Sequence, residues 1–423
     1  MTIQQGEFRF ELANNFGGVF MFKKLVLMVV VFAFFVTLGM SKTELTLWQF
    51  MMNDDTGMAV VEEFEAQNPD IEVEFVQLSW ANGFDKIVTA FAAGSAPDVL
   101  ELGNTWVANF ADEGVLTKMN EIKQTHPDIV GWESASYMGD YWGFPWLLGT
   151  RAMFYNIDLF EEAGLDPANP PETWDEVLEA AQKIASLGED MYGFGLASGE
   201  PYSPWQEWFL PAVWGNNGQV VSDDLKTAEF NSDAVKEAAE FYQNLSEYSM
   251  MTKQEDLINS FGEGRVGMVV GGAHQISSLF TSYPETKFLV AFVPRPSEDK
   301  GFHASFAGGE ILTIPKESEN KEAALKLIEF LAKPDVAMRV TKSYPAVFPS
   351  NKNAEEDPWF DDHPLEYVFF QQNATAVPVP PTPDWTDIQE KVSEAVEALI
   401  LDKEPVDETL DKYNGQIQDI LDQ

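Results

Sequence analysis

The chain has 423 residues, of which 45% are hydrophobic and 13% aromatic, and it contains no cysteine. Its formal net charge of −43 argues against nucleic acid or an anionic membrane surface as a partner, because both are negatively charged. Without cysteine there are no disulfides, no thiolate chemistry and no lipid anchor on a cysteine. The length exceeds that of one ordinary hydrophobic core, so two lobes are expected.

The first 41 residues are expected to lie outside the folded protein. Residues 21–41 are typical of a secretory signal peptide: Lys23 and Lys24 precede the apolar run Leu25–Leu38, which is short for a membrane span. Cleavage is expected just after Ser41, and an uncleaved anchor is the alternative. Residues 1–20 do not fit such a signal and are interpreted as an untranslated upstream segment. An exported chain without a lipid anchor is expected in the periplasm.

The chain after residue 42 begins with strands and helices in alternation. Residues 45–50 are apolar and strand-like, and residues 71–75 alternate between apolar side chains and glutamates, as in a half-buried strand. Residues 84–91 carry apolar side chains at helical spacing, and residues 99–102 form a further strand. Short connections between such elements predict a parallel α/β layer.

Ligands of parallel α/β sheets bind at the carboxyl ends of the strands. The loops expected at that edge follow the first and third strands, and a further loop precedes the helix at 84–91. These loops carry aromatic rings and amide groups together, as a sugar site requires. The predicted ligand contacts from this part of the chain are Trp48, Gln49, Trp80, Asn104, Thr105 and Trp106.

A short joint, Gly149-Thr150-Arg151, separates this layer from a second α/β region. Thr173 and Glu176 have capping-box spacing, which predicts the start of a helix. A strand is expected at 193–197, followed by a loop rich in aromatic and acceptor groups at 200–208. Sugar rings pack their C–H faces on aromatic rings, and their hydroxyl groups need polar partners. The predicted contacts here are Trp146, Glu200, Tyr202 and Trp205.

The last third of the chain is expected to hold strands at 268–270 and 311–314 and a helix at 324–331, with two amphipathic helices in the tail. Lys333-Pro334-Asp335 breaks the helix at 324–331. Only four arginines follow residue 41, which disfavours an anionic ligand, although Arg151 could serve one carboxylate.

Motifs for metals, cofactors and catalysis are not supported. Gly262, Gly264 and Gly267 match G-x-G-x-x-G, but a strand follows these glycines instead of preceding them. The four histidines lack zinc-ligand spacing, the acidic pairs lack the EF-hand pattern, and no G-x-S-x-G or H-E-x-x-H occurs. We therefore expect no cofactor, no metal site and no catalytic residue.

The run Tyr-Asn-x-Asp-Leu-Phe at 155–160, with Ala-Gly-Leu at 163–165 and Pro-Pro-x-Thr-Trp-Asp-Glu at 170–176, resembles the extracellular solute-binding proteins of carbohydrate ABC transporters. This class includes maltose-binding protein, and the likeness covers essentially the whole chain after residue 42. It implies an α/β fold of two lobes, each a sheet flanked by helices, joined by a hinge of several crossings. The implied crossings lie at 145–151, 305–309 and 333–335.

The resemblance also implies the lobes and the site. One lobe would hold residues 43–149 and 309–333, the other 152–304 and 336–423. Glu200-Pro201-Tyr202 matches the family's sugar loop, and residues 104–106 occupy the position of a second ligand loop. The remaining matches by position are Trp48, Gly272, His274 and Trp385, where His274 replaces a usual tryptophan.

The implied function is a periplasmic substrate-binding protein that captures a neutral sugar or oligosaccharide, closes by hinge bending and delivers the ligand to an ABC permease. It would act as a monomer and catalyse nothing. Two alternatives stay open at this stage. A secreted glycoside hydrolase would also have aromatic rings and carboxylates in its cleft, and a binding module for a sensor would share every feature above.

Overall fold

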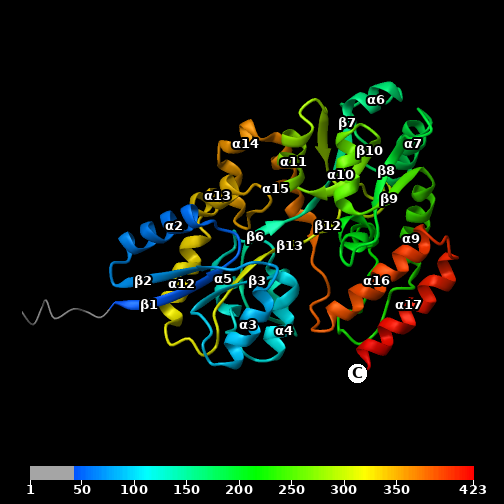
Figure 1. The fold of residues 1–423 in the computed structure, drawn as a ribbon. Coiled ribbons are helices and arrows are strands. Elements are labelled where there is room, and N and C mark those ends of the chain that lie inside the picture. Colours follow the sequence, from blue (N-terminus) through cyan, green and yellow to red (C-terminus); the bar gives the residue numbers. More distant parts are fainter. Residues whose placement is uncertain (1–41) are drawn as a thin grey trace, which may run out of the picture.

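The computed structural model describes residues 42–423. The predicted upstream segment and signal peptide therefore lie outside the described residues. Figure 1 shows two lobes: blue and cyan segments with the yellow helix α12 form one, and green segments with the red helices α16 and α17 form the other. No helix in the described range is long and apolar enough to cross a membrane. The mixed α/β, two-lobed fold expected from the sequence is confirmed.

The first lobe is built on a six-stranded sheet with the order β14-β6-β13-β3-β1-β2. The strand β1 pairs in parallel with β2 and β3, whereas β13 runs antiparallel to β3 and β6. In β2 the alternation is visible in the burial, because Ile71 and Val73 are buried and Glu72 and Glu74 are exposed. The strands are β1 (Thr43–Gln49), β2 (Ile71–Gln77), β3 (Val99–Gly103), β6 (Phe144–Gly149), β13 (Gly308–Thr313) and β14 (Phe348–Pro349), and a small hairpin has β4 (Ser136–Tyr137) and β5 (Asp140–Tyr141).

Helices cover this sheet and close its core. Phe64 of α2 and Phe330 of α12 pack with ring centroids 5.4 Å apart, and both are buried. Asn53 caps the start of the helix α2, because its side chain accepts the backbone N–H of Thr56. The helical segments of this lobe are α2 (Asp54–Gln67), α3 (Gly83–Ala92), η1 (Asn104–Trp106), α4 (Val107–Asp112), α5 (Asn120–Thr125), η2 (Trp132–Ala135), α12 (Lys321–Leu331) and α13 (Pro334–Ser343).

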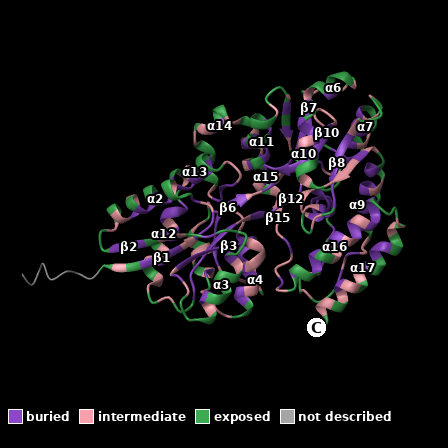
Figure 2. Cartoon of the chain, in the orientation of Figure 1, coloured by how far each residue is buried: buried purple, intermediate pink, exposed green. Residues whose placement is uncertain are grey.

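The second lobe has a five-stranded sheet with the order β11-β7-β10-β8-β9. The predicted capping box is present at the start of α7, where Thr173 N–H donates to Glu176 over 2.9 Å. Buried residues make up much of the strands and parts of the helices in both lobes (Figure 2). The strands are β7 (Arg151–Asn156), β8 (Tyr192–Ala197), β9 (Ser249–Thr252), β10 (Val266–Gly272) and β11 (Phe288–Ala291). The helical segments are α6 (Ile157–Glu162), α7 (Trp174–Ala185), η3 (Trp205–Phe209), α8 (Leu210–Gly215), α9 (Asp233–Leu245), η4 (Ser246–Tyr248), α10 (Gln254–Gly262), α11 (His274–Ser282), η5 (Lys352–Glu356), α14 (Trp359–Asp362), α15 (Pro364–Gln372), η6 (Asn373–Thr375), α16 (Trp385–Ile400) and α17 (Val406–Leu421).

Two segments of the chain cross from one lobe to the other, and these two crossings lie side by side. The strand β6 ends at Gly149 in the first sheet and β7 begins at Arg151 in the second. The return crossing runs from β12 (Ser305–Phe306), which pairs with β15 (Ala376–Val377), into β13. The hydroxyl group of Ser305 accepts the backbone N–H of Arg151 and donates to its carbonyl oxygen, each over 2.8 Å. The two crossings are thus bonded to each other at the hinge.

The third crossing lies later in the chain than predicted. Residues 333–335 were expected to enter the second lobe, but Val336 and Val340 of α13 are buried in the core of the first lobe. The strand β14 then pairs with β6, so the first lobe extends to Pro349. The reason is that Pro334 stands at the first turn of a new helix, where a missing N–H costs nothing. The break in the sequence was a helix start instead of a crossing.

Candidate ligand-binding cleft

A cavity of about 520 Å³ lies between the two sheets, beside the crossings. Its walls come from both lobes, and the crossing strands supply Gly149, Arg151 and Gly308 between them. The volume is within the range of small-molecule sites, about 300–1,000 Å³. Eight predicted contacts line it: Trp80, Asn104, Thr105, Trp106, Tyr202, Trp205, His274 and Trp385.

The first-lobe wall is a cluster of aromatic rings. Trp80 stacks on Phe50 with centroids 4.1 Å apart, and Trp106 lies 5.2 Å from Trp80. The Trp80 side chain is 45% exposed, so much of its ring remains free for a ligand. Asn104 donates its amide to the carbonyl oxygen of Ala307 over 2.8 Å, which ties this loop to the return crossing.

The second-lobe wall has buried tryptophans and one exposed tyrosine. Trp205 meets Trp385 edge to face, with centroids 5.4 Å apart, and it meets Phe306 in the same way at 5.6 Å. Trp205 opens the π-helical turn η3, a distortion that is frequent at functional sites. Tyr202 is 55% exposed and offers the most accessible ring on this side.

The charged groups of the cavity are neutralised locally. Arg151 Nε lies 2.8 Å from Glu207, and both side chains are nearly buried. Burial and the charge of Arg151 lower the pKa of His274 to about 4, so its ring is neutral at pH 7. Burial also raises the pKa of Glu310 well above its usual range, and its contact with Glu101 adds to that effect. Burial raises the pKa of Glu101 to about 7.

The structure places two predicted contacts away from the cavity lining, because their side chains belong to the first-lobe core. Trp146 is fully buried, and its Nε1 donates to the carbonyl oxygen of Leu331 over 3.0 Å. Gln49 is also fully buried, and its amide donates to the carbonyl oxygen of Met52 over 2.9 Å. Gln49 therefore closes the turn after β1 instead of facing a ligand.

Three further predicted residues lie near the cavity but not in its lining. Trp48 packs toward α3, where Lys86 Nζ lies 4.6 Å from its ring centroid. Glu200 accepts the backbone N–H of Gln254 and faces an adjoining groove of about 580 Å³, which shares Tyr202 with the cavity. Gly272 allows the approach of His274, since a Cβ there would lie 2.9 Å from the ring Nδ1.

The lining also includes residues that the sequence interpretation missed. Tyr344 follows α13, which the misplaced third crossing had assigned to the other lobe. Gln389 lies one helical turn after Trp385 on α16, so the i, i+4 spacing was an available signal. The other missed lining residues with side-chain functional groups or rings are Met51, Gln206, Phe306, Glu310 and Thr386.

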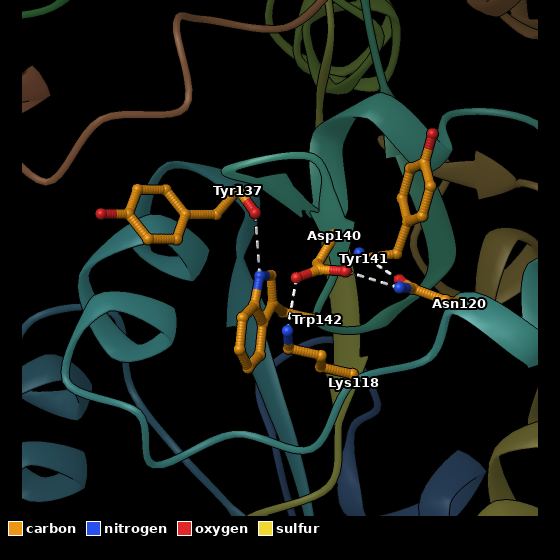
Figure 3. A network of polar contacts seen from close by, with 6 residues as sticks. All are labelled: Lys118, Asn120, Tyr137, Asp140, Tyr141 and Trp142. Carbon is orange, nitrogen blue, oxygen red and sulfur yellow. Dashed lines mark hydrogen bonds and ion pairs between the residues drawn. The ribbon is translucent and has the colours of Figure 1, made fainter.

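The aromatic pair Tyr141–Trp142 belongs to a polar network at the hairpin β4–β5 (Figure 3), and neither residue is among those that line the cavity. Trp142 Nε1 donates to the carbonyl oxygen of Tyr137 over 3.1 Å, and Lys118 Nζ lies 5.0 Å from the Trp142 ring. The hydrogen bonds from Lys118 and Asn120 lower the pKa of Asp140. This network holds the hairpin to the first lobe.

Two lobes joined by bonded crossings, with an aromatic cavity between them, define a binding protein for small solutes. A match to the family model for bacterial extracellular solute-binding proteins extends over residues 53–338. The chain belongs to this family, as its sequence motifs indicated.

Solved and curated relatives agree with this assignment. An ABC-transporter solute-binding protein of Thermotoga lettingae, bound to α-D-tagatose, is 30% identical with a TM-score of 0.71, over 90% of this chain and 100% of that one. The maltotriose-binding protein of Pyrococcus abyssi is 25% identical over 88% of this chain and 82% of its own length. The sn-glycerol-3-phosphate-binding periplasmic protein of Salmonella typhimurium is 24% identical over 88% and 91%.

Proposed function

We propose that this chain captures a neutral sugar or oligosaccharide between its lobes and delivers it to the permease of an ABC transporter. The observation that carries the proposal is the pair of aromatic walls, with Trp80 and Trp106 on one lobe and Tyr202 and Trp205 on the other. A ligand that touches both walls favours the closed arrangement of the lobes, and a permease can recognise this closed conformation.

Polar groups suited to hydroxyls lie between the rings. The amides of Asn104, Gln206 and Gln389 line the cavity, together with the hydroxyl groups of Thr105 and Tyr202. Such groups donate and accept hydrogen bonds without carrying charge, which matches the hydroxyl pattern of a sugar. The sugar ligands of the relatives from Thermotoga lettingae and Pyrococcus abyssi support this choice over the phosphate ester of the Salmonella relative.

The hypothesis that the protein is a glycoside hydrolase is less well supported. Hydrolysis of a glycosidic bond needs two carboxyl groups on opposite sides of the bond, about 5–9.5 Å apart. Among the described residues that line the cavity, Glu310 is the only carboxylic acid. Its partner Glu101 lies behind it in the same sheet and is fully buried, so the pair does not flank a substrate. Membership of a family of binding proteins points the same way.

Thermal unfolding in the presence of mono- and oligosaccharides tests the proposal directly. A ligand at about 100 times its Kd stabilises the folded chain by about 2.7 kcal/mol. We expect at least one neutral sugar to raise the melting temperature of the protein without residues 1–41. The proposal fails if no neutral sugar does so while a charged solute does. Release of the aglycone from chromogenic glycosides would favour the hydrolase.

Trp106→Ala is expected to weaken binding of the best sugar at least tenfold. The ring lies in the centre of the first-lobe wall, where loss of a buried aromatic contact costs about 2 kcal/mol or more. Isothermal titration calorimetry measures the change. Trp142→Ala is the matched control, because it removes a tryptophan of the same lobe that the hairpin holds away from the cavity. Equal affinities for the two variants would remove Trp106 from the site.

A further inference from the structure

Arg151 reaches the cavity with its charge already compensated. Its side chain lines the cavity, whereas Glu207 lies behind it in η3 and is not among the lining residues. The Arg151 Nε to Glu207 Oε2 distance is 2.8 Å, and the side chains are only 14% and 12% exposed. The terminal Nη1 approaches the carbonyl oxygen of Thr150 at 3.3 Å. Glu207 therefore lies against Nε as an ion-pair partner, and the backbone accepts a hydrogen bond from Nη1.

No other cation in the described lining could attract an anion. Arg151 is the only lysine or arginine among the described residues of the cavity wall. His274 is uncharged at pH 7, since burial and Arg151 lower its pKa to about 4. Burial raises the pKa of Glu310 well above its usual range, which favours its uncharged form. The balance of charge around a ligand is thus set by one ion pair.

We propose that Glu207 sets the charge selectivity of the cavity: it engages Arg151 from behind and thereby excludes phosphate and carboxylate ligands in favour of uncharged polyhydroxy compounds. A free guanidinium binds such anions with two parallel hydrogen bonds, but here the carboxylate of Glu207 already lies 2.8 Å from Nε as an ion-pair partner. The carboxylate of Glu207 also repels an incoming anion at short range, where screening by water is weak. This inference rests on the proposed function, because it names the charge class of that ligand.

Replacing Glu207 with glutamine tests the proposal through a gain of binding. Glu207→Gln frees the charge of Arg151, so we expect glycerol 3-phosphate and D-glucuronate to bind at least tenfold more tightly than to the wild type. Glycerol and D-glucose, the uncharged counterparts, should show no such gain. Calorimetry gives the affinities, and glycerol 3-phosphate should raise the melting temperature of the variant more than that of the wild type. A structural defect alone would produce neither the tighter binding of the anions nor the larger rise in melting temperature.

The controls separate charge from disruption. Glu207→Asp keeps the negative charge, so we expect no gain in anion binding. Glu207→Met removes the charge, so we expect the same gain as in Glu207→Gln. The methionine variant is used in place of Glu207→Gln if the glutamine variant does not fold. Glu263→Gln removes the same charge from an exposed pair with Arg265, 2.7 Å apart, and should leave anion binding at the wild-type level. Arg151→Met added to Glu207→Gln should abolish the gain.

Three results would overturn the inference, and they differ in their consequence. If the wild type binds a neutral sugar but neither uncharged variant at position 207 gains anion affinity, Glu207 does not set selectivity and the proposed function stands. If the wild type binds glycerol 3-phosphate as tightly as Glu207→Gln does and no sugar stabilises it, both fail. A gain in Glu207→Asp equal to that in Glu207→Gln would also overturn the inference.

Discussion

Trp146→Ala is expected to lower the free energy of unfolding by about 3–5 kcal/mol, the usual cost of truncating a buried large aromatic side chain. Trp146 is fully buried in β6, and its indole N–H is bonded to the carbonyl oxygen of Leu331 in α12. The substitution leaves a cavity and also leaves that carbonyl oxygen without its partner. Urea unfolding followed by circular dichroism measures the change.

Trp80→Ala is the control for this substitution. The Trp80 side chain is 45% exposed in the cleft, so its loss should cost less than about 1 kcal/mol of stability and should weaken ligand binding instead. Trp146→Ala would then reduce mainly the stability of the fold, and Trp80→Ala would reduce mainly the affinity for the ligand. A loss below 1 kcal/mol for Trp146→Ala, with ligand affinity reduced, would return Trp146 to the binding site and contradict the core position.

The secondary structure that depends on local pattern was predictable. The alternation of Ile71 and Val73 with glutamates gave β2, and Thr173 with Glu176 gave the capped start of α7. Both signals come from residues a few positions apart, which interact directly in the folded chain. The match of the segment at 155–176 to a known family then supplied the two-lobed fold, which no local signal contains.

Residue patterns predicted the cleft where aromatic residues follow the ends of strands, as Trp80 and Trp106 do, and the family resemblance supplied His274 and Trp385. Trp146 could not be placed, because every residue from Phe144 to Leu148 in β6 is buried and the strand shows no alternation to mark a face. Tyr344 was missed because it follows α13, and Pro334 at the start of that helix is equally consistent with a helix break or a helix start. These ambiguities are resolved by packing between segments distant in sequence, which the order of residues alone does not reveal.

The carboxyl pair Glu101–Glu310 is the least predictable feature, since 209 positions separate two residues that meet only through the pairing of β3 with β13. Glu101 is fully buried and accepts the backbone N–H of Phe50 over 2.9 Å, and Glu310 is 7% exposed at the cavity wall. Burial raises the pKa of Glu101 from 4.5 to about 7 and that of Glu310 well above 4.5. The pair therefore holds protons in the folded chain that the unfolded chain releases.

This pair makes stability fall as the pH rises. Because the folded pKa values are raised, the folded state binds more protons than the unfolded state between pH 4.5 and 7, and the slope of the unfolding free energy with pH is negative. The contribution is complete below about pH 4.5 and is lost as the pH rises through 7. For Glu101 alone, the rise of its pKa from 4.5 to about 7 corresponds to about 3 kcal/mol.

We therefore expect the free energy of unfolding, measured in urea between pH 4.5 and 8, to decrease by about 3 kcal/mol more in the wild type than in Glu101→Gln/Glu310→Gln. The net charge of −43 adds a general loss of stability with rising pH, so a variant with the same charge change is needed. Glu74→Gln/Glu113→Gln removes two exposed carboxylates of the same lobe and should keep the wild-type slope. Equal slopes for the wild type and the buried double variant would show that the pair does not hold its protons in the folded chain.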